Sequence, residues 1–411
     1  MEHYMELKKK KTISWQRAFT YTVIQNLVLC LGHFAVNPNV VTYAKFLGAG
    51  TTLTGFLAGM FFGVALAIRP VSGPMITKMD KRMLLIGVFA LGFIAQIGYA
   101  AFPNLPMFVV FRILNGAQYS FVGSLIMTRV GDILPPEKMV SGMGIYGVGG
   151  AIGMSLAPAI GTWILNFGQT RYGELTGYRM MFLYAAVMMI IAIIPCLLSP
   201  PDKKKTPEEL AAIGKWYKNI ATVKAIPIAA VAFFSVMAYS VYNAYIYEFA
   251  KENGIGIQQA SLFFSVLAIG LLVTRPVMGM ITDKLGIKRV VIPGFVLFAS
   301  SFIIVGYSKS LGIMLFAAAV AAIGYGSTQP TTQAMVVRVV PPVKRGVATN
   351  TYYVGVDLGF FLGPLIGGYV IEWVGNYGDM FKLFTIPAVI ALILFAMVLP
   401  ATMRQIDKVN K

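Results

Sequence analysis

Long apolar runs, separated by charged segments or by segments rich in Pro and Gly, recur along the whole chain. A membrane-spanning helix needs about 20 apolar residues, and most of these runs have about that length. Twelve runs can be delimited, at about 18–41, 52–70, 83–102, 106–128, 139–165, 179–198, 226–249, 258–277, 290–307, 311–335, 347–371 and 380–400. The pattern therefore predicts an all-α membrane protein with twelve transmembrane helices.

The composition supports this prediction. Of the 411 residues, 57% are hydrophobic and 12% are charged, and the mean hydropathy is +0.73. An average soluble domain is about 25% charged, so a soluble globular fold, a disordered chain and a disulfide scaffold are excluded. Cys30 and Cys196 both lie in apolar runs, where we expect small buried side chains rather than a disulfide. His3 and His33 are too few for a histidine metal site, so neither a metal nor a cofactor is expected.

The charge distribution predicts an orientation. The chain has 34 Lys and Arg against 16 Asp and Glu, a net charge of +18. A nucleic-acid partner is not expected, because nucleic-acid-binding proteins are not this apolar. With the N-terminus inside, 27 of the cations, Arg69 and Arg275 among them, fall on the inner side, six fall outside, and Arg112 lies within a run. This asymmetry predicts cytoplasmic N- and C-termini in the inner (plasma) membrane of a bacterium, with the lipid bilayer as a partner.

The two halves of the chain resemble each other at an offset of 206 residues. Arg69-Pro70 corresponds to Arg275-Pro276, and the pattern of 157–161 corresponds to that of 363–367. Two similar bundles that both start inside must be parallel repeats. This architecture is typical of secondary transporters, whose binding site lies between the halves near the membrane midplane.

The repeat also predicts the domain organisation. We expect a six-helix bundle over 1–200, a cytoplasmic linker over 201–225 and a second six-helix bundle over 226–411. Within the linker, Thr206-Pro207-Glu208-Glu209 combines an N-cap, a first-turn proline and a capping-box glutamate. A short amphipathic surface helix is therefore expected there, and a plain solvated linker is the alternative.

One inner loop resembles a family motif. Its residues Gly279-x-x-x-Asp283-Lys284-x-Gly286-x-Lys288-Arg289 are similar to the G-x-x-x-D-[RK]-x-G-[RK]-[RK] loop of the major facilitator superfamily. The resemblance implies a gating loop formed by Gly279, Asp283, Lys284, Gly286 and Arg289, in which Gly286 permits a tight turn and Asp283 can meet a helix N-terminus. The first-half copy carries Thr77 at the Asp position, so the gating role extends only to the second half.

Two further motifs resemble the twelve-span drug or metabolite:proton antiporters of this superfamily. Arg112-x-x-Asn115-Gly116 is similar to their R-x-x-q-G motif, and Gly144-x8-Gly153-x3-Ala157-Pro158-x2-Gly161 is similar to their G-x8-G-x3-G-P-x2-G-G signature. Glycines spaced by four residues let helices approach closely, and proline adds a kink. We expect this helix-packing role for Gly153, Pro158, Gly161, Gly359, Gly363, Pro364 and Gly367.

Asp357 is the acid that lies deepest within a predicted span. It is about ten residues, or roughly 15 Å, from the inner end of its run. A carboxyl group at that depth can carry a proton through a conformational cycle. We expect proton coupling by Asp357 with Arg112 as its charge partner. The alternatives are an Asp357 that only fixes a kinked helix, and an Arg112 that caps carbonyl groups or reaches outward to the headgroups.

Polar and aromatic side chains within the runs predict a substrate cavity. Tyr239, Tyr242 and Asn243 share one helical face, which suits the wall of a cavity for a mid-sized, partly apolar solute. For His33, a core position is the alternative. The expected cavity residues are His33, Asn26, Asn115, Tyr119, Tyr146, Tyr239, Tyr242, Asn243, Gln329 and Tyr353.

These observations favour a monomeric secondary transporter that exports a small organic molecule in exchange for protons. The alternative is an uptake symporter or facilitator for an organic anion or a nutrient, because the same fold supports both directions. The chain is not expected to be an enzyme, since no His/Cys cluster, phosphate loop or Ser-His-Asp set is visible in the sequence.

Overall fold

The computed structural model describes residues 2–49, 51–199, 208 and 215–410. The described residues form helices and no β-strand. The twelve long helices are α1 (Glu2–Val36), α3 (Thr51–Lys78), α4 (Lys81–Ala101), α5 (Leu105–Ile133), α6 (Met139–Tyr172), α7 (Glu174–Leu198), α9 (Ile226–Glu252), α10 (Ile257–Leu285), α11 (Ile287–Tyr307), α12 (Leu311–Arg338), α13 (Arg345–Val374) and α15 (Thr385–Asn410). Two short helices, α2 (Val40–Phe46) and α14 (Tyr377–Leu383), lie between long ones.

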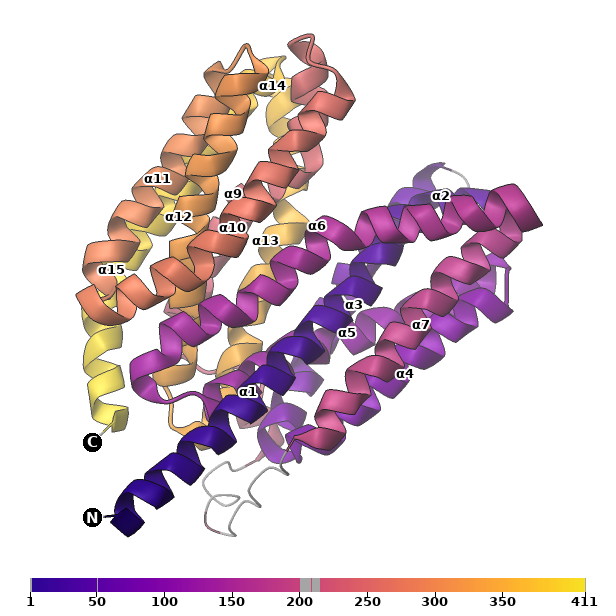
Figure 1. Cartoon of the computed structure of the whole chain (residues 1–411). Helices are drawn as coiled ribbons and strands as arrows, with labels where there is room; N and C mark the ends of the chain where they lie inside the picture. The colour runs from indigo at the N-terminus through magenta and orange to yellow at the C-terminus, as the bar shows by residue number, and fades with distance from the viewer. Residues whose placement is uncertain (1, 50, 200–207, 209–214, 411) are drawn as a thin grey trace.

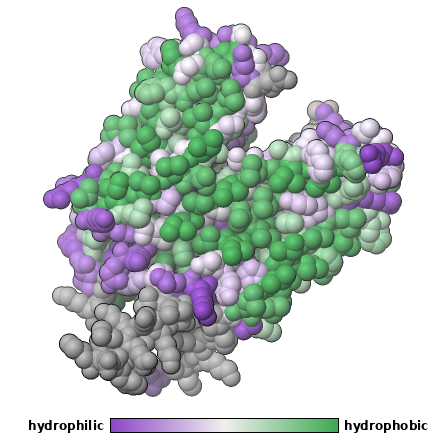
Figure 2. All heavy atoms as spheres, viewed as in Figure 1, coloured by the Kyte–Doolittle hydropathy of each residue, from purple (hydrophilic) through white to green (hydrophobic). Residues whose placement is uncertain are grey.

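Eleven helices of the described chain are long and apolar enough to cross a membrane. α5 has sufficient length but is more polar, because it carries Arg112, Asn115 and Gln118 on buried positions. It packs between α3 and α4, so these polar side chains are enclosed by protein rather than by lipid. The apolar flanks of both bundles are visible in Figure 2, with hydrophilic residues gathered at the ends.

The long helices form two bundles that meet at one end and diverge at the other (Figure 1). α1 and α3 to α7 form the first bundle, and α9 to α13 with α15 form the second. Both termini lie at the end where the bundles meet. The contacts between the bundles run mainly from α6 to α10 and from α3 to α13. These two contacts correspond to each other under the 206-residue repeat.

Close approach of helices within each bundle depends on the glycine motifs. α6 packs on α1 so closely that a Cβ at Gly153 would overlap Cys30, and one at Gly161 would overlap the carbonyl oxygen of Ala35. α13 packs on α9 in the same way at Gly359, Gly363 and Gly367. Pro158 and Pro364 lie inside α6 and α13.

Helix ends are stabilised by local polar groups. Asp80 caps α4 by accepting a hydrogen bond from the Met83 N–H at 2.8 Å. Gly286, with φ of +89°, forms the turn between α10 and α11. The amphipathic helix expected from Thr206 lies outside the described residues except for residue 208, and the described part of the linker contains a short 3-10 helix, Trp216–Asn219.

Candidate functional site

A buried ion pair joins the two bundles. Arg69 of α3 contacts Asp357 of α13, with Nε donating to Oδ2 at 2.9 Å and Nη2 at 2.8 Å from the same oxygen. The two side chains are 2% and 1% exposed. Two buried opposite charges with direct hydrogen bonds compensate each other's desolvation, whereas either one alone would be costly. Each of the two charges in the α3–α13 contact is therefore stabilised by the other.

Polar groups from both bundles surround this ion pair. The Nη1 group of Arg69 donates to the Ser120 carbonyl at 2.6 Å, and its guanidinium lies 5.1 Å from the ring centroid of Tyr353. Asn350 of α13 donates to the Arg69 carbonyl at 2.8 Å and accepts from Ser72 at 2.9 Å. The α3–α13 contact is thus held by a hydrogen-bonded network with the Arg69–Asp357 pair at its centre.

The structure does not bring Arg112 to Asp357. Arg112 is buried in the first bundle, where Nε donates to the Leu57 carbonyl at 3.2 Å and the guanidinium lies over the Phe61 ring at 4.9 Å. The expected pairing of Arg112 with Asp357 is therefore wrong, since Arg69 occupies that position.

A second contact between the bundles involves the gating-loop motif. Asp283, near the C-terminal end of α10, accepts hydrogen bonds from the N–H groups of Val140 at 3.3 Å and Ser141 at 2.9 Å. These N–H groups belong to the first turn of α6, where a carboxylate complements the helix dipole. Thr77 takes the equivalent position in the first half and donates to the Gly73 carbonyl of its own helix at 2.8 Å. The carboxylate contact to a helix N-terminus is therefore present in only one of the two copies.

Two more contacts close the same end of the molecule. Asp132 of α5 forms ion pairs with Arg345 of α13 at 2.9 Å and with Lys81 of the first bundle at 3.0 Å. The hydroxyl oxygens of Thr128 and Thr349 are 2.6 Å apart across the interface. The interface between the bundles is therefore sealed at this end, while the opposite end is hollowed into a cleft (Figure 2).

A pocket lies between the bundles. Its cavity volume is about 90 Å³. Its lining comprises Ala151 and Ser155 of α6, Tyr239 and Asn243 of α9, and Phe264, Leu267, Ala268, Leu271 and Arg275 of α10. Aromatic and apolar walls with a few polar groups are typical of small-molecule sites.

Other expected cavity residues contact neighbours within and between the bundles. The Tyr353 ring of α13 lies against Gly123 of α5, across the interface between the bundles. Asn26 donates to the Tyr146 carbonyl at 3.0 Å. Tyr119 stacks on His33 with ring centroids 5.3 Å apart. Gln329 accepts a hydrogen bond from Arg275 at 2.5 Å.

Two residues assigned to the cavity lie elsewhere. Tyr242 is fully buried inside the second bundle, where its hydroxyl is 2.7 Å from that of Ser301 and its ring stacks on Phe302. Asn115 is buried in α5 within the first bundle. The placement of Tyr242 on a cavity wall is wrong, because the face of α9 that carries it turns into the bundle while Tyr239 and Asn243 line the pocket.

Arg69 and Arg275 are functional candidates that the charge pattern did not identify. Both were counted among inner-side cations because each lies at the inner end of a predicted run, 52–70 or 258–277. Instead α3 and α10 continue for several residues beyond them, and both side chains are buried. The sequence signal that marks them is the repeated Arg-Pro at an offset of 206 residues.

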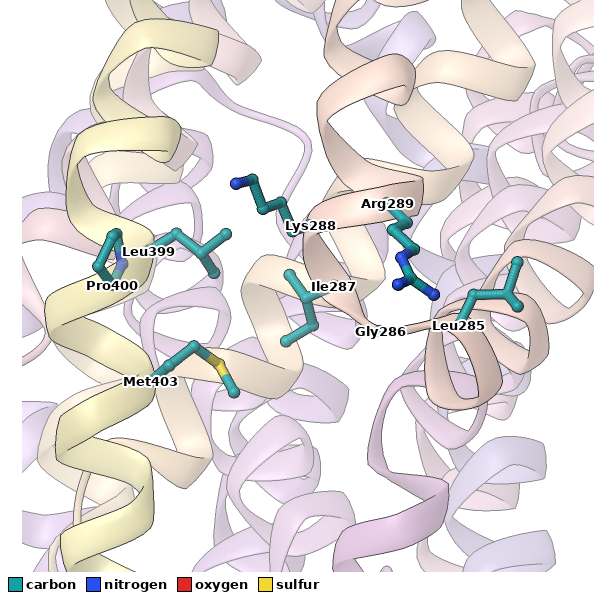
Figure 3. Close-up of a pocket in the computed structure, with 8 residues that line it drawn as sticks. All are labelled: Leu285, Gly286, Ile287, Lys288, Arg289, Leu399, Pro400 and Met403. Carbon is teal, nitrogen blue, oxygen red and sulfur yellow. The ribbon is translucent and has the colours of Figure 1, made fainter.

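A separate surface pocket lies on the flank of the second bundle (Figure 3). It is formed at the α10–α11 turn and by α15, with Ile287, Leu399 and Met403 pointing into the gap (Figure 3). All of its lining residues belong to one bundle, so it does not face the cleft. The pocket that Arg275 lines, in contrast, has walls from both bundles.

Comparison with known proteins adds a family and two relatives. Residues 22–227 and 228–411 each match the sequence profile of the Major Facilitator Superfamily. The multi-drug resistance efflux pump PmrA of Streptococcus pneumoniae is 27% identical, over 89% of this chain and 91% of that protein. The staphylopine export protein of Staphylococcus aureus is 23% identical, over 87% of this chain and 91% of that protein.

The fold is also similar to that of a solved transporter. The fucose:proton symporter FucP of E. coli, in its outward conformation, superposes with a TM-score of 0.77 over 93% of this chain and 99% of that one. The sequences are 11% identical, so this likeness concerns the fold alone.

Proposed function

Because the chain belongs to the Major Facilitator Superfamily, it is a multi-pass plasma-membrane transporter and not an enzyme, and we propose that it exports a small organic molecule in exchange for protons. The names of the two relatives, an efflux pump and an export protein, support the direction. The observation that carries the coupling is the buried Arg69–Asp357 pair between the bundles.

The proposed cycle uses the charge of Asp357 to control the closed end. With Asp357 ionised, its attraction to Arg69 stabilises the α3–α13 contact and keeps the cleft open on the opposite side. When Asp357 binds a proton, the ion pair is lost and the contact weakens, so the bundles can rock around the central pocket. Given cytoplasmic termini, the described state faces outward, and a proton entering from outside opens the cytoplasmic side for substrate.

The alternative is an uptake symporter or facilitator. The same fold serves a fucose:proton symporter, so the fold by itself does not set the direction. The proposal of export depends on the two relatives, and the coupling ion and the monomeric state remain part of the proposal.

Everted membrane vesicles test the proposed exchange. Respiration acidifies their lumen, and an acridine dye reports the proton gradient while staphylopine is added as the probe. A proton-driven exporter takes up the probe into the lumen and releases protons, so the dye fluorescence recovers. We expect this recovery for the wild type and its loss for Asp357→Asn.

Asp379→Asn serves as the matched control, because Asp379 lies on α14, away from the Arg69–Asp357 network, in an exposed ion pair with Lys382. Its exchange should equal that of the wild type. Full proton-linked exchange in Asp357→Asn, with normal insertion into the membrane, would reject Asp357 as the coupling group.

A further inference from the structure

Arg275 is a buried cation without a carboxylate partner among the described residues. Its side chain is 7% exposed and lines the pocket between the bundles. Nη1 donates to the Gly147 carbonyl and Nη2 to the Gln329 side chain, whereas Nε has no hydrogen-bond partner. Two neutral oxygens do not balance a full charge in a membrane interior, so this guanidinium has an unmet requirement for an anion.

The internal repeat shows what is missing. Under the offset of 206, Arg275 corresponds to Arg69, whose neighbours on α13 are Asn350, Tyr353 and Asp357. The corresponding residues on α6 are Gly144, Gly147 and Ala151, respectively. The first position therefore lacks the amide of its counterpart on α13, the second lacks the aromatic ring, and the third lacks the carboxylate.

The geometry confirms that the two contacts are equivalent. Gly144 packs directly on the Arg275 carbonyl, as Asn350 contacts the Arg69 carbonyl. Gly147 accepts a hydrogen bond from the Arg275 guanidinium, which passes over it as the Arg69 guanidinium passes over Tyr353. In each copy an arginine faces the same position of the opposite helix, which is Asp357 on α13 and Ala151 on α6.

The missing side chains leave a small cavity beside Arg275. Ala151 borders the same pocket as Arg275, at the position where the carboxylate stands in the other copy. The remaining wall offers the Tyr239 ring, the Phe264 ring and the Asn243 amide. A guanidinium beside aromatic and apolar groups suits a molecule with one anionic group on an apolar body.

We propose that the transported substrate is an organic anion whose carboxylate, or an equivalent anionic group, is bound by Arg275 in place of the carboxylate that the repeat lacks. This inference rests on the proposed function, since it assigns the substrate class of the same cleft. Binding of the anion neutralises Arg275 and joins α10 to the substrate, as Asp357 joins Arg69 to α13.

Ligand binding to purified protein, without a proton gradient, tests the assignment. Three matched pairs differ only in charge: indole-3-acetate and indole-3-acetamide, hippurate and its amide, and naphthalene-2-sulfonate and its sulfonamide. Ethidium is included as a cationic ligand for comparison. Thermal shift and equilibrium binding give the affinities. We expect the anion of at least one pair to bind about tenfold tighter than its neutral partner, the effect of a charge-assisted hydrogen bond.

Three variants connect this preference to the site. Arg275→Gln should remove the tenfold preference, and Ala151→Asp should remove it as well, because it supplies an internal carboxylate to Arg275. The control is Lys288→Gln, which removes an exposed cation at the α10–α11 turn and should retain the preference. Because Ala151→Asp adds a counter-ion instead of deleting the cation, it separates loss of binding from loss of fold.

The outcomes are distinguishable from those of the exchange experiment. No anion preference in any pair, a preference that persists in Arg275→Gln, or ethidium binding that exceeds every anion would overturn the inference. An anion preference without proton-linked exchange would retain the Arg275 site and reject the exporter. Proton-linked exchange without an anion preference would retain the exporter and reject the Arg275 site.

Discussion

The side chains of Arg69 and Asp357 depend on each other, because both are almost completely buried. Removing one partner of a buried ion pair leaves an uncompensated charge and costs about 3–5 kcal/mol, whereas removing both costs much less. We expect Arg69→Gln and Asp357→Asn each to lower the midpoint of thermal unfolding in detergent. The double variant should regain most of the loss. A double variant whose loss equals the sum of the two single losses would show that the pair contributes no mutual stabilisation.

Sequence reasoning singled out Asp357 as an acid within a span, but it did not find Arg69 as the partner in the ion pair. An acid deep within an apolar run stands out by its position alone, because a carboxyl group within the membrane is energetically costly and is therefore rare outside functional sites. Arg69 lies 288 residues away along the chain, and no local pattern connects the two. It also lies at the inner end of the predicted run 52–70, so it was counted with the inner-side cations. Tyr242 was misplaced for a related reason, since helical spacing defines a face but not which neighbour that face meets.

At the scale of elements, the α1–α6 contact depends on Gly161. A Cβ at this position would overlap the backbone carbonyl of Ala35, which cannot move as a flexible side chain can. Gly161→Ala should therefore destabilise the protein by about 1–3 kcal/mol, the usual cost of overpacking. Gly63→Ala is the matched control, because open space surrounds that position and alanine favours a helix. Thermal unfolding checks both, and equal midpoints would contradict close packing at Gly161.

The elements themselves followed from the hydrophobic pattern, but their extents did not. Every predicted run corresponds to a long helix, since a backbone in lipid must satisfy its own hydrogen bonds. α3 nevertheless reaches Lys78, well beyond the run that stops at residue 70. Its polar inner turns are covered by α13 and α5 rather than by lipid, so hydropathy does not report them. The short helices α2 and α14 were not predicted, because neither has the length of a span.

At the scale of the whole molecule, the contacts at the end where the bundles meet determine which side of the cleft is open. The contacts there are distributed over both symmetry-related interfaces: the Arg69 network and the Asp132–Arg345 pair on one side, and the Asp283 cap of α6 on the other. In alternating access the bundles must separate at this end before the cleft can close at the other. Any covalent link across the end should therefore stop transport without disturbing the pocket.

Thr128 and Thr349 are positions at which such a link can be introduced. They lie on α5 and α13 with their hydroxyl oxygens 2.6 Å apart, so cysteines at both positions should form a disulfide. In a background where Cys30 and Cys196 are replaced by Ala, we expect oxidised T128C/T349C to lose probe exchange in everted vesicles and dithiothreitol to restore it. Oxidised T128C alone controls for thiol modification. Because the pocket lies outside the link, the oxidised protein should still bind an accepted anion. A cross-linked protein that exchanges at the reduced rate would show that the bundles need not separate there.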